Sequence, residues 1–167
     1  VLQQQGKLAE ALNAIVSYRE KFPYNPYGQL IHAALIGLQG DDKEQNRMLR
    51  QVQMQLNNLP ENAKEQEDVL LLAATMDFSQ EKFEQAILKL RRALKLYPAN
   101  YQVHQLLAQS YLQLGDAKTA GGFSRQALEL NPADFQLYLL GAAVARAQRD
   151  PATELKLLQQ AFSAFPQ

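Results

Sequence analysis

The amino-acid sequence predicts an all-α fold of stacked helical hairpins, and three observations carry that prediction. Residue types recur with a spacing of 34 along the C-terminal part of the chain. Apolar residues repeat at three- and four-residue steps, which is the pattern of helices with one buried face. No alternating pattern of the length of a useful strand appears. Self-similarity at this period is typical of helical-hairpin arrays.

Three columns of residues share the 34-residue spacing. They are Pro98, Pro132 and Pro166; Ala93, Ala127 and Ala161; and Leu94, Leu128 and Phe162. A further small-residue column holds Ala86 and Ala120 and is broken by Glu154. Because columns with one common period rarely arise by chance, we expect tandem structural units.

The segment 82–97 shows how one helix of such a unit is built. Its apolar residues form a single stripe, with charged or amide side chains filling most positions between them. Asp150 can accept a backbone N–H at a helix start, and Pro151 is tolerated at the first helical position. The pairs Asn25-Pro26 and Asn131-Pro132 are predicted to separate one helix from the next.

Composition excludes several classes of protein. The chain has 167 residues, 47% of them hydrophobic, and 17 basic residues balance 17 acidic ones. With zero net charge, a dedicated nucleic-acid binder is not expected. Without cysteine, disulfides, thiolate metal sites and a cysteine nucleophile are excluded. No apolar run is long enough to predict a membrane-spanning helix.

The segment from Leu107 to Pro132 resembles the tetratricopeptide repeat. The matching residues are Leu107, Ala108, Tyr111, Leu114, Gly115, Ala120, Ala127, Leu128 and Pro132. The resemblance implies one right-handed solenoid over 1–167. Its units would be a partial repeat at 1–25, an extended divergent repeat at 26–66, and repeats at 67–100, 101–134 and 135–167. The extension is expected in the turn-rich run 57–62.

Some positions depart from the family pattern. His104 stands where the family often has tryptophan, and Ser124 replaces a large residue on the second helix. Asp77 replaces the expected tyrosine, a departure that neighbouring Phe78 could offset. The chain also begins midway through a repeat, which predicts a fragment of a longer protein containing such repeats.

Small residues are predicted to lie where helices approach closely. They are Ala74, Ala86, Ala93, Ala108, Ala120, Ala127, Ala142 and Ala161. Larger leucine and tyrosine side chains would fill the remaining gaps. A leucine at one of these positions should therefore overpack the seam between helices.

No catalytic or metal-binding motif appears. The histidines, His32 and His104, have no metal-ligand spacing, and structural roles are favoured for both. Phosphate-binding glycine motifs are absent, so Gly121-Gly122 is better explained by a close helix crossing or a local bend. We expect no cofactor, no metal and no enzymatic activity in this segment.

Basic residues cluster on the second helix of the 67–100 unit. They are Lys82, Lys89, Arg91, Arg92 and Lys95, and Glu81 and Glu84 interrupt them. A solvated outer face explains the cluster better than a phosphate site. Aromatic residues do not alternate with these charges, as they would in a protein that binds single-stranded nucleic acid.

By resemblance to the family, the first helix of each unit faces inward and supplies the working surface. The predicted partner-binding residues are Tyr27, Leu30, Leu71, Thr75, Gln102, Gln105, Gln109, Gln113, Gln136, Leu139 and Arg146. Glutamine amides can pair with the main chain of a bound peptide without demanding charge. The alternative is that they are simply solvated helix formers in a chain with 22 glutamines.

Two specialised grooves of the family are not expected. The column Leu72, Leu106 and Leu140 lacks the Lys, Arg and Asn residues that clamp a C-terminal carboxylate, and it lacks an asparagine ladder.

The predicted function is a non-enzymatic scaffold that holds a protein or peptide segment. One alternative is the substrate-recruiting arm of a larger protease or transferase whose catalytic domain lies outside this segment. Self-association through exposed solenoid ends is another. The glutamine-rich composition is similar to that of bacterial proteins of this family, from the cell envelope or the cytoplasm.

Overall fold

The computed structural model describes residues 2–23 and 25–165. These described residues form α-helices joined by short connections and contain no strand. They divide into two compact units, residues 1–64 and residues 65–167. Pro166, a member of the predicted proline column, lies outside the described residues.

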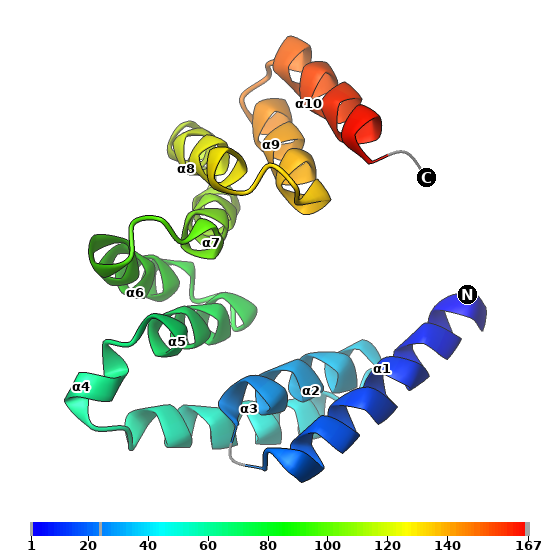
Figure 1. Cartoon of the computed structure of the whole chain (residues 1–167), viewed down its shortest axis with the longest axis vertical. Helices are drawn as coiled ribbons and strands as arrows, with labels where there is room; N and C mark the ends of the chain where they lie inside the picture. The colour runs from blue at the N-terminus through cyan, green and yellow to red at the C-terminus, as the bar shows by residue number, and fades with distance from the viewer. Residues whose placement is uncertain (1, 24, 166–167) are drawn as a thin grey trace. The chain divides into compact units, whose positions relative to one another are not determined.

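The first unit contains helices α1 to α4 (Figure 1). Their bounds are α1 Leu2–Lys21, α2 Pro26–Leu38, α3 Asp42–Asn57 and α4 Glu61–Lys64. α2 packs on both α1 and α3. Ala33, Met48 and Leu49 form a buried cluster between α2 and α3, because both helices turn an apolar stripe toward each other.

The second unit contains three helical hairpins, as the 34-residue period predicts. Their helices are α5 Glu67–Ser79, α6 Phe83–Leu96, α7 Tyr101–Gln113, α8 Ala117–Leu130, α9 Phe135–Ala147 and α10 Pro151–Ala164. Within this unit α5, α7 and α9 lie on one side, and α6, α8 and α10 lie on the other (Figure 1). Each hairpin packs on the next, through α6 against α7 and α8 against α9.

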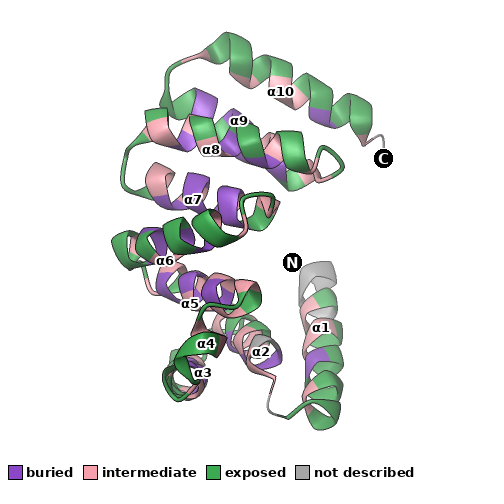
Figure 2. Ribbon diagram, turned by 60° about the vertical axis from the view of Figure 1, so that its left-hand side comes forward, coloured by how far each residue is buried: buried purple, intermediate pink, exposed green. Residues whose placement is uncertain are grey.

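Alanines fill the seams between these helices, which confirms the predicted role of the small-residue columns. Seven of the eight predicted alanines have no exposed surface, and Ala142 is 3% exposed. A methyl side chain lets two helix backbones approach closely enough for neighbouring leucines to interlock. Figure 2 shows buried residues gathered where α5 to α9 face one another, whereas α10 is mostly exposed.

Polar side chains fix most of the helix starts in the second unit. Asn100, Asp116, Asp134 and Asp150 each accept a backbone N–H of the first helical turn. Asp150 is followed by Pro151 in the first turn, as predicted from the sequence. α5 and α6 differ because their N-cap residues, Gln66 and Lys82, make no side-chain capping bond.

The turn between the two helices of a hairpin has the same backbone shape in each hairpin of this unit. Glu81, Gly115 and Arg149 are 34 residues apart, and all have positive φ, at 60°, 80° and 60°. Only glycine adopts this left-handed conformation without steric cost. The shared turn therefore persists even where the residue does not favour it.

Candidate functional site

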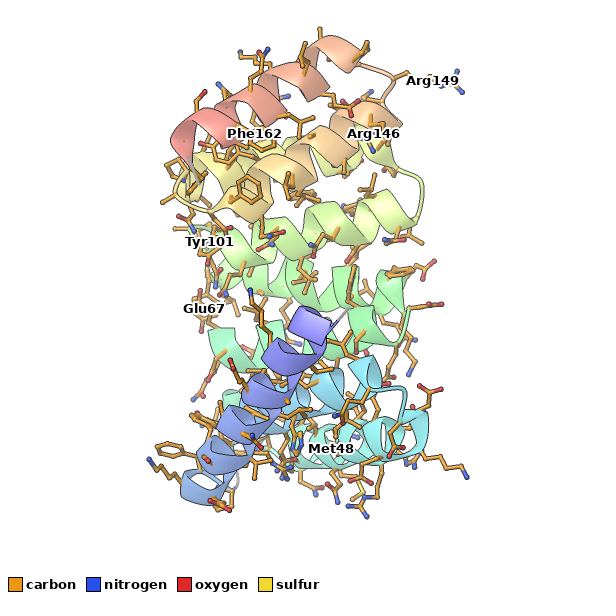
Figure 3. All side chains as sticks on the ribbon, turned by 90° about the vertical axis from the view of Figure 1, so that its right-hand side faces the viewer. Met48, Glu67, Tyr101, Arg146, Arg149 and Phe162 are labelled. Carbon is orange, nitrogen blue, oxygen red and sulfur yellow. The ribbon has the colours of Figure 1, made fainter. Side chains whose placement is uncertain are left out.

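In the second unit, the predicted partner-binding residues lie along one side of α5, α7 and α9, the first helices of its three hairpins. We call this surface the inner wall: Leu71 and Thr75 on α5; Gln102, Gln105, Gln109 and Gln113 on α7; Gln136, Leu139 and Arg146 on α9. Each of these side chains is half-buried or exposed. They recur at three- and four-residue steps, so each helix presents them on one face. Figure 3 views the molecule from this side.

Two predicted residues belong to the first unit. Leu30 is half-buried and packs against the cluster of Ala33, Met48 and Leu49, so part of its surface serves the core. Tyr27 falls on α2, but its side chain lies outside the described residues.

The amide groups of the inner-wall glutamines are not used by the protein itself. Gln102, Gln105, Gln109, Gln113 and Gln136 make no side-chain hydrogen bond to a described residue. Glutamines elsewhere do bond: Gln29 donates to the Pro23 carbonyl at 3.2 Å, Gln53 to Asn57 at 2.9 Å and Gln148 to the Ala117 carbonyl at 2.7 Å. The inner wall therefore offers uncommitted donors and acceptors.

Arg146 is already paired, unlike those glutamines. Its Nε and Nη2 atoms donate to Glu154 Oε1 at 2.7 and 2.5 Å. The hydrogen bond first, and then the negative charge of Glu154, raise the pKa of Arg146 above its usual value. Glu154 occupies the position of Ala86 and Ala120, so the break in the small-residue column supplies the partner of this arginine.

A shallow depression lies at the other end of the inner wall, where Figure 3 labels Glu67 and Tyr101. It encloses about 450 Å³ and includes Tyr97, Asn100 and Gln102 in its lining. Asn100 Nδ2 donates to Glu67 Oε1 at 2.7 Å, which ties the α6–α7 connection to the start of α5. Sequence reasoning missed this depression, although two tyrosines flanking a Pro-Ala-Asn turn were a signal for it.

His104 has a structural role, in agreement with the favoured interpretation. It is 5% exposed, lies against Phe123, and its Nε2 is 2.9 Å from the Pro98 carbonyl oxygen. Tyr138 donates in the same way to the Pro132 carbonyl at 3.1 Å. In both cases the donor lies six residues after the proline, as it also does in the bond from Gln29 to Pro23. These bonds satisfy carbonyls at the junctions between hairpins.

His32 is held by a neighbouring cation. Arg19 Nη1 donates to His32 Nδ1 at 2.6 Å, which requires that nitrogen to be unprotonated. Burial first, and then the Arg19 charge, lower the pKa of His32. The described residues contain no group of side chains able to hold a metal ion.

The basic cluster on α6 does more than face solvent. Lys89 forms an ion pair with the buried carboxylate of Asp77, and Arg92 pairs with Glu65. Arg91 donates to the hydroxyl of Tyr111 at 2.6 and 3.0 Å. Arg91 and Arg92 are exposed, as the solvated-face prediction expects, although each also has a bonding partner; only Lys89, which is half-buried against Asp77, departs from it. An apolar-stripe analysis of α6 alone cannot reveal partners that lie outside α6.

The Asp77–Lys89 pair also accounts for the missing tyrosine of the 67–100 unit. Asp77 is 4% exposed and lies where the next hairpin has Tyr111. Phe78, the residue expected to offset the change, packs edge-on against Phe83 with ring centres 5.3 Å apart. An ion pair within the same hairpin thus takes the place of the tyrosine ring.

Gly121 and Gly122 lie inside α8 in different surroundings. A Cβ at Gly121 would come within 2.5 Å of Gln148 Nε2, whereas a Cβ at Gly122 would meet nothing within 4 Å. That short contact is with the end of a flexible side chain, and the nearest atom of α9 itself, Val144 Cγ1, lies at an ordinary 3.6 Å, so the close-crossing interpretation of Gly121 stays a prediction.

Comparison with known proteins agrees with the hairpin architecture. Residues 77–147 match the family described as tetratricopeptide repeat. The second unit accordingly has the right-handed, all-α solenoid fold of this family. No curated protein matches the chain in sequence.

Solved structures of tetratricopeptide-repeat proteins share the fold at low sequence identity. MamA from Desulfovibrio magneticus RS-1 has 13% identity and a TM-score of 0.60, with 97% of this chain and 88% of that chain covered. PilF from Pseudomonas aeruginosa has 18% identity and a TM-score of 0.61, with 99% and 72% covered. A monomeric mutant of IFIT1 with Gppp-AAAA has 16% identity and a TM-score of 0.74, with 93% and 37% covered.

No helix in the described part of the chain combines the length and the apolar character needed to cross a membrane.

Proposed function

We propose that the inner wall of residues 65–167 binds an extended segment of a partner protein and holds it, without catalysis. The proposal takes 67–100, 101–134 and 135–167 as the repeats that build this wall. The observation that carries it is the row of glutamine amides that are accessible and have no hydrogen-bond partner among the described residues.

A glutamine side chain suits the main chain of a peptide. Its NH₂ group donates to a peptide carbonyl, and its oxygen accepts from a peptide N–H. Four of these amides lie along α7, and Gln136 continues the surface on α9. Leu71 and Leu139 on the flanking helices are half-buried and offer apolar anchors.

The charge of the wall favours a protein segment over a nucleic acid. Its one basic residue, Arg146, is neutralised by Glu154. A phosphate backbone would require several uncompensated cations. The IFIT1 structure with Gppp-AAAA therefore suggests the fold of this chain and not its ligand.

The test replaces amide donors on the wall by carboxylates. Peptides are selected from a displayed random library on the wild-type protein, and their affinities are measured by fluorescence anisotropy. Gln105→Glu combined with Gln109→Glu should weaken the selected peptides at least about tenfold, because each loses a donor and gains repulsion toward peptide carbonyls. Circular dichroism should show unchanged helicity.

A matched control carries the same charge change on the opposite side. Gln85→Glu combined with Gln126→Glu alters two exposed glutamines on α6 and α8. This control should bind the selected peptides like the wild type. Equal affinities for the folded wall variant and the control would contradict the proposal.

A further inference from the structure

We propose that a pocket among α8, α9 and α10 binds the tyrosine side chain of a partner protein. The pocket has a volume of about 140 Å³, and its lining includes Gly121, Ser124, Arg125, Gly141, Ala145 and Leu157. This site shares no lining residue with the inner wall, so a ligand could bind here whether or not the inner wall binds a peptide.

The pocket exists because small residues replace large ones at equivalent positions, meaning positions 34 residues apart. On α8, Gly121 and Ser124 are equivalent to Ile87 and Leu90 of α6. On α9, Gly141 and Ala145 are equivalent to Leu107 and Tyr111 of α7. The large residues belong to or pack against one continuous hydrophobic cluster. Their replacement removes side-chain volume from a place that the helix backbones still enclose.

The preceding hairpin shows what occupies the equivalent place. There the ring of Tyr111 stacks on Phe123, with ring centres 5.7 Å apart and planes 5° apart. Arg91 lies 5.8 Å from the centre of the tyrosine ring and donates to its hydroxyl at 2.6 and 3.0 Å. The phenol is thus held between an apolar surface and a guanidinium group.

The pocket keeps these surroundings and lacks the ring. Leu157 is equivalent to Phe123, Arg125 to Arg91, and Ala145 to Tyr111. Arg125 lines the pocket and is exposed, and it makes no ion pair or hydrogen bond to a described residue. A phenol entering from solvent would therefore meet an apolar surface and an available cation.

Size and polarity agree with this occupant. A cavity of roughly 150 Å³ is sufficient to take up benzene. Ser124, one of the lining residues, is 4% exposed, and its hydroxyl has no hydrogen-bond partner among the described residues. A ring bearing one hydroxyl would fill the apolar volume and use Arg125, whereas a purely apolar ring would leave the guanidinium unused.

The test compares p-cresol, the analogue of the tyrosine side chain, with toluene. Each is titrated into the ¹⁵N-labelled protein, and amide shifts are followed by NMR. Both should shift Gly121, Gly141 and Ala145, with p-cresol binding about two- to tenfold more tightly, the range of one hydrogen bond. Arg125→Gln should abolish that preference. Shifts elsewhere, no shifts, or equal binding of the two probes to the wild type would overturn the proposal.

A second variant restores the missing tyrosine within the chain. Ala145→Tyr should fill the pocket and block p-cresol, whereas Ala143→Tyr, on an exposed position of the same helix, should not. If Ala145→Tyr does not fold, the Arg125→Gln comparison still decides the matter. N-acetyl-tyrosine methylamide should shift the same amides as p-cresol. If N-acetyl-tyrosine methylamide does not bind, the proposal that a partner protein supplies the ring is overturned.

Discussion

Residues 67–100 and residues 101–134 have the same hairpin backbone but different side chains at the positions that join their two helices. The first joins α5 to α6 through the ion pair of Asp77 and Lys89. The second joins α7 to α8 through the stacked rings of Tyr111 and Phe123. Both pairs lie at equivalent positions, so the fold accepts either kind of contact there.

This difference shows that the two facing residues must be compatible with each other, whereas the identity of either one alone can change. An aspartate in the place of a tyrosine is tolerated because a lysine replaces the phenylalanine opposite it. A buried carboxylate without its cation would be strongly destabilising, whereas an aromatic pair has no such dependence on charge. The following hairpin has only Ala145 and Leu157 there, and a pocket results.

The largest effect is expected from breaking the ion pair. Lys89→Met leaves the Asp77 carboxylate buried without its cation and should lower the free energy of unfolding by about 2–3 kcal/mol. This is below the full value for a buried pair, because the lysine side chain is 38% exposed. Urea denaturation measures the change.

Two further variants sharpen that test. Asp77→Tyr combined with Lys89→Phe copies the aromatic pair into the first hairpin and should recover at least half of the loss. Lys82→Met, on an exposed position, should change stability by less than about 0.5 kcal/mol. A double variant as unstable as Lys89→Met alone would show that the two hairpins are not interchangeable here.

Overpacking should affect both hairpins alike. Ala120 has no exposed surface and lies in a cluster with Ala108, Leu140 and Val144. Ala120→Leu should cost about 1–3 kcal/mol, because the helices must separate to admit the larger side chain. Thermal denaturation by circular dichroism measures the cost. The equivalent change at Ala86 should behave similarly, and a neutral result at either would mean that its seam is loosely packed.

His104 contributes one hydrogen bond to the junction between the hairpins. His104→Leu places the residue of the equivalent position, Leu70, at a site where the Pro98 carbonyl needs a donor. The expected cost is about 1 kcal/mol by chemical denaturation. His104→Gln should restore most of it, because Gln29 makes this bond in the first unit. Equal stability of the leucine and glutamine variants would exclude the hydrogen bond as the cause.

The smallest effect concerns the helix starts. Lys82 does not cap α6, whereas the equivalent Asp116 accepts from the Thr119 N–H at 3.0 Å. Lys82→Asp should therefore stabilise the first hairpin by about 0.5–1 kcal/mol near neutral pH, as measured by urea denaturation.

The pH dependence of that gain follows from Asp116. Hydrogen bonds from the Thr119 side chain and then its backbone lower the pKa of Asp116. A lowered folded-state pKa means that the cap stabilises at higher pH and is lost as pH falls through that pKa, below about pH 4. Gln85 stands at the position of Thr119, so an aspartate at position 82 would keep only the backbone bond, and the gain from Lys82→Asp should disappear as pH falls below about 4. A gain that persists at pH 3 would argue against capping.

The architecture of the second unit was predictable because it depends on local pattern. The spacing of Pro98 and Pro132, the alanine columns and the stripe along 82–97 each reflect helix geometry or turn chemistry within one unit. Burial of Ala86 and Ala120 followed from the same pattern. The inner wall is an intermediate case. The sequence placed Gln105 and Gln109 on an accessible helix face, and binding there stays a prediction.

The sequence by itself determined the helices, their pairing into hairpins and the small residues at their seams, because these follow from periodicity along one segment. Only the tertiary structure decided which charged residues are paired, as with Lys89 and Arg91, because their partners lie on other helices. It alone also showed that Gly121 and Ala145 leave a space between helices. A cavity is the difference between side-chain volume and backbone spacing, and the spacing is set by the packing of all the helices together.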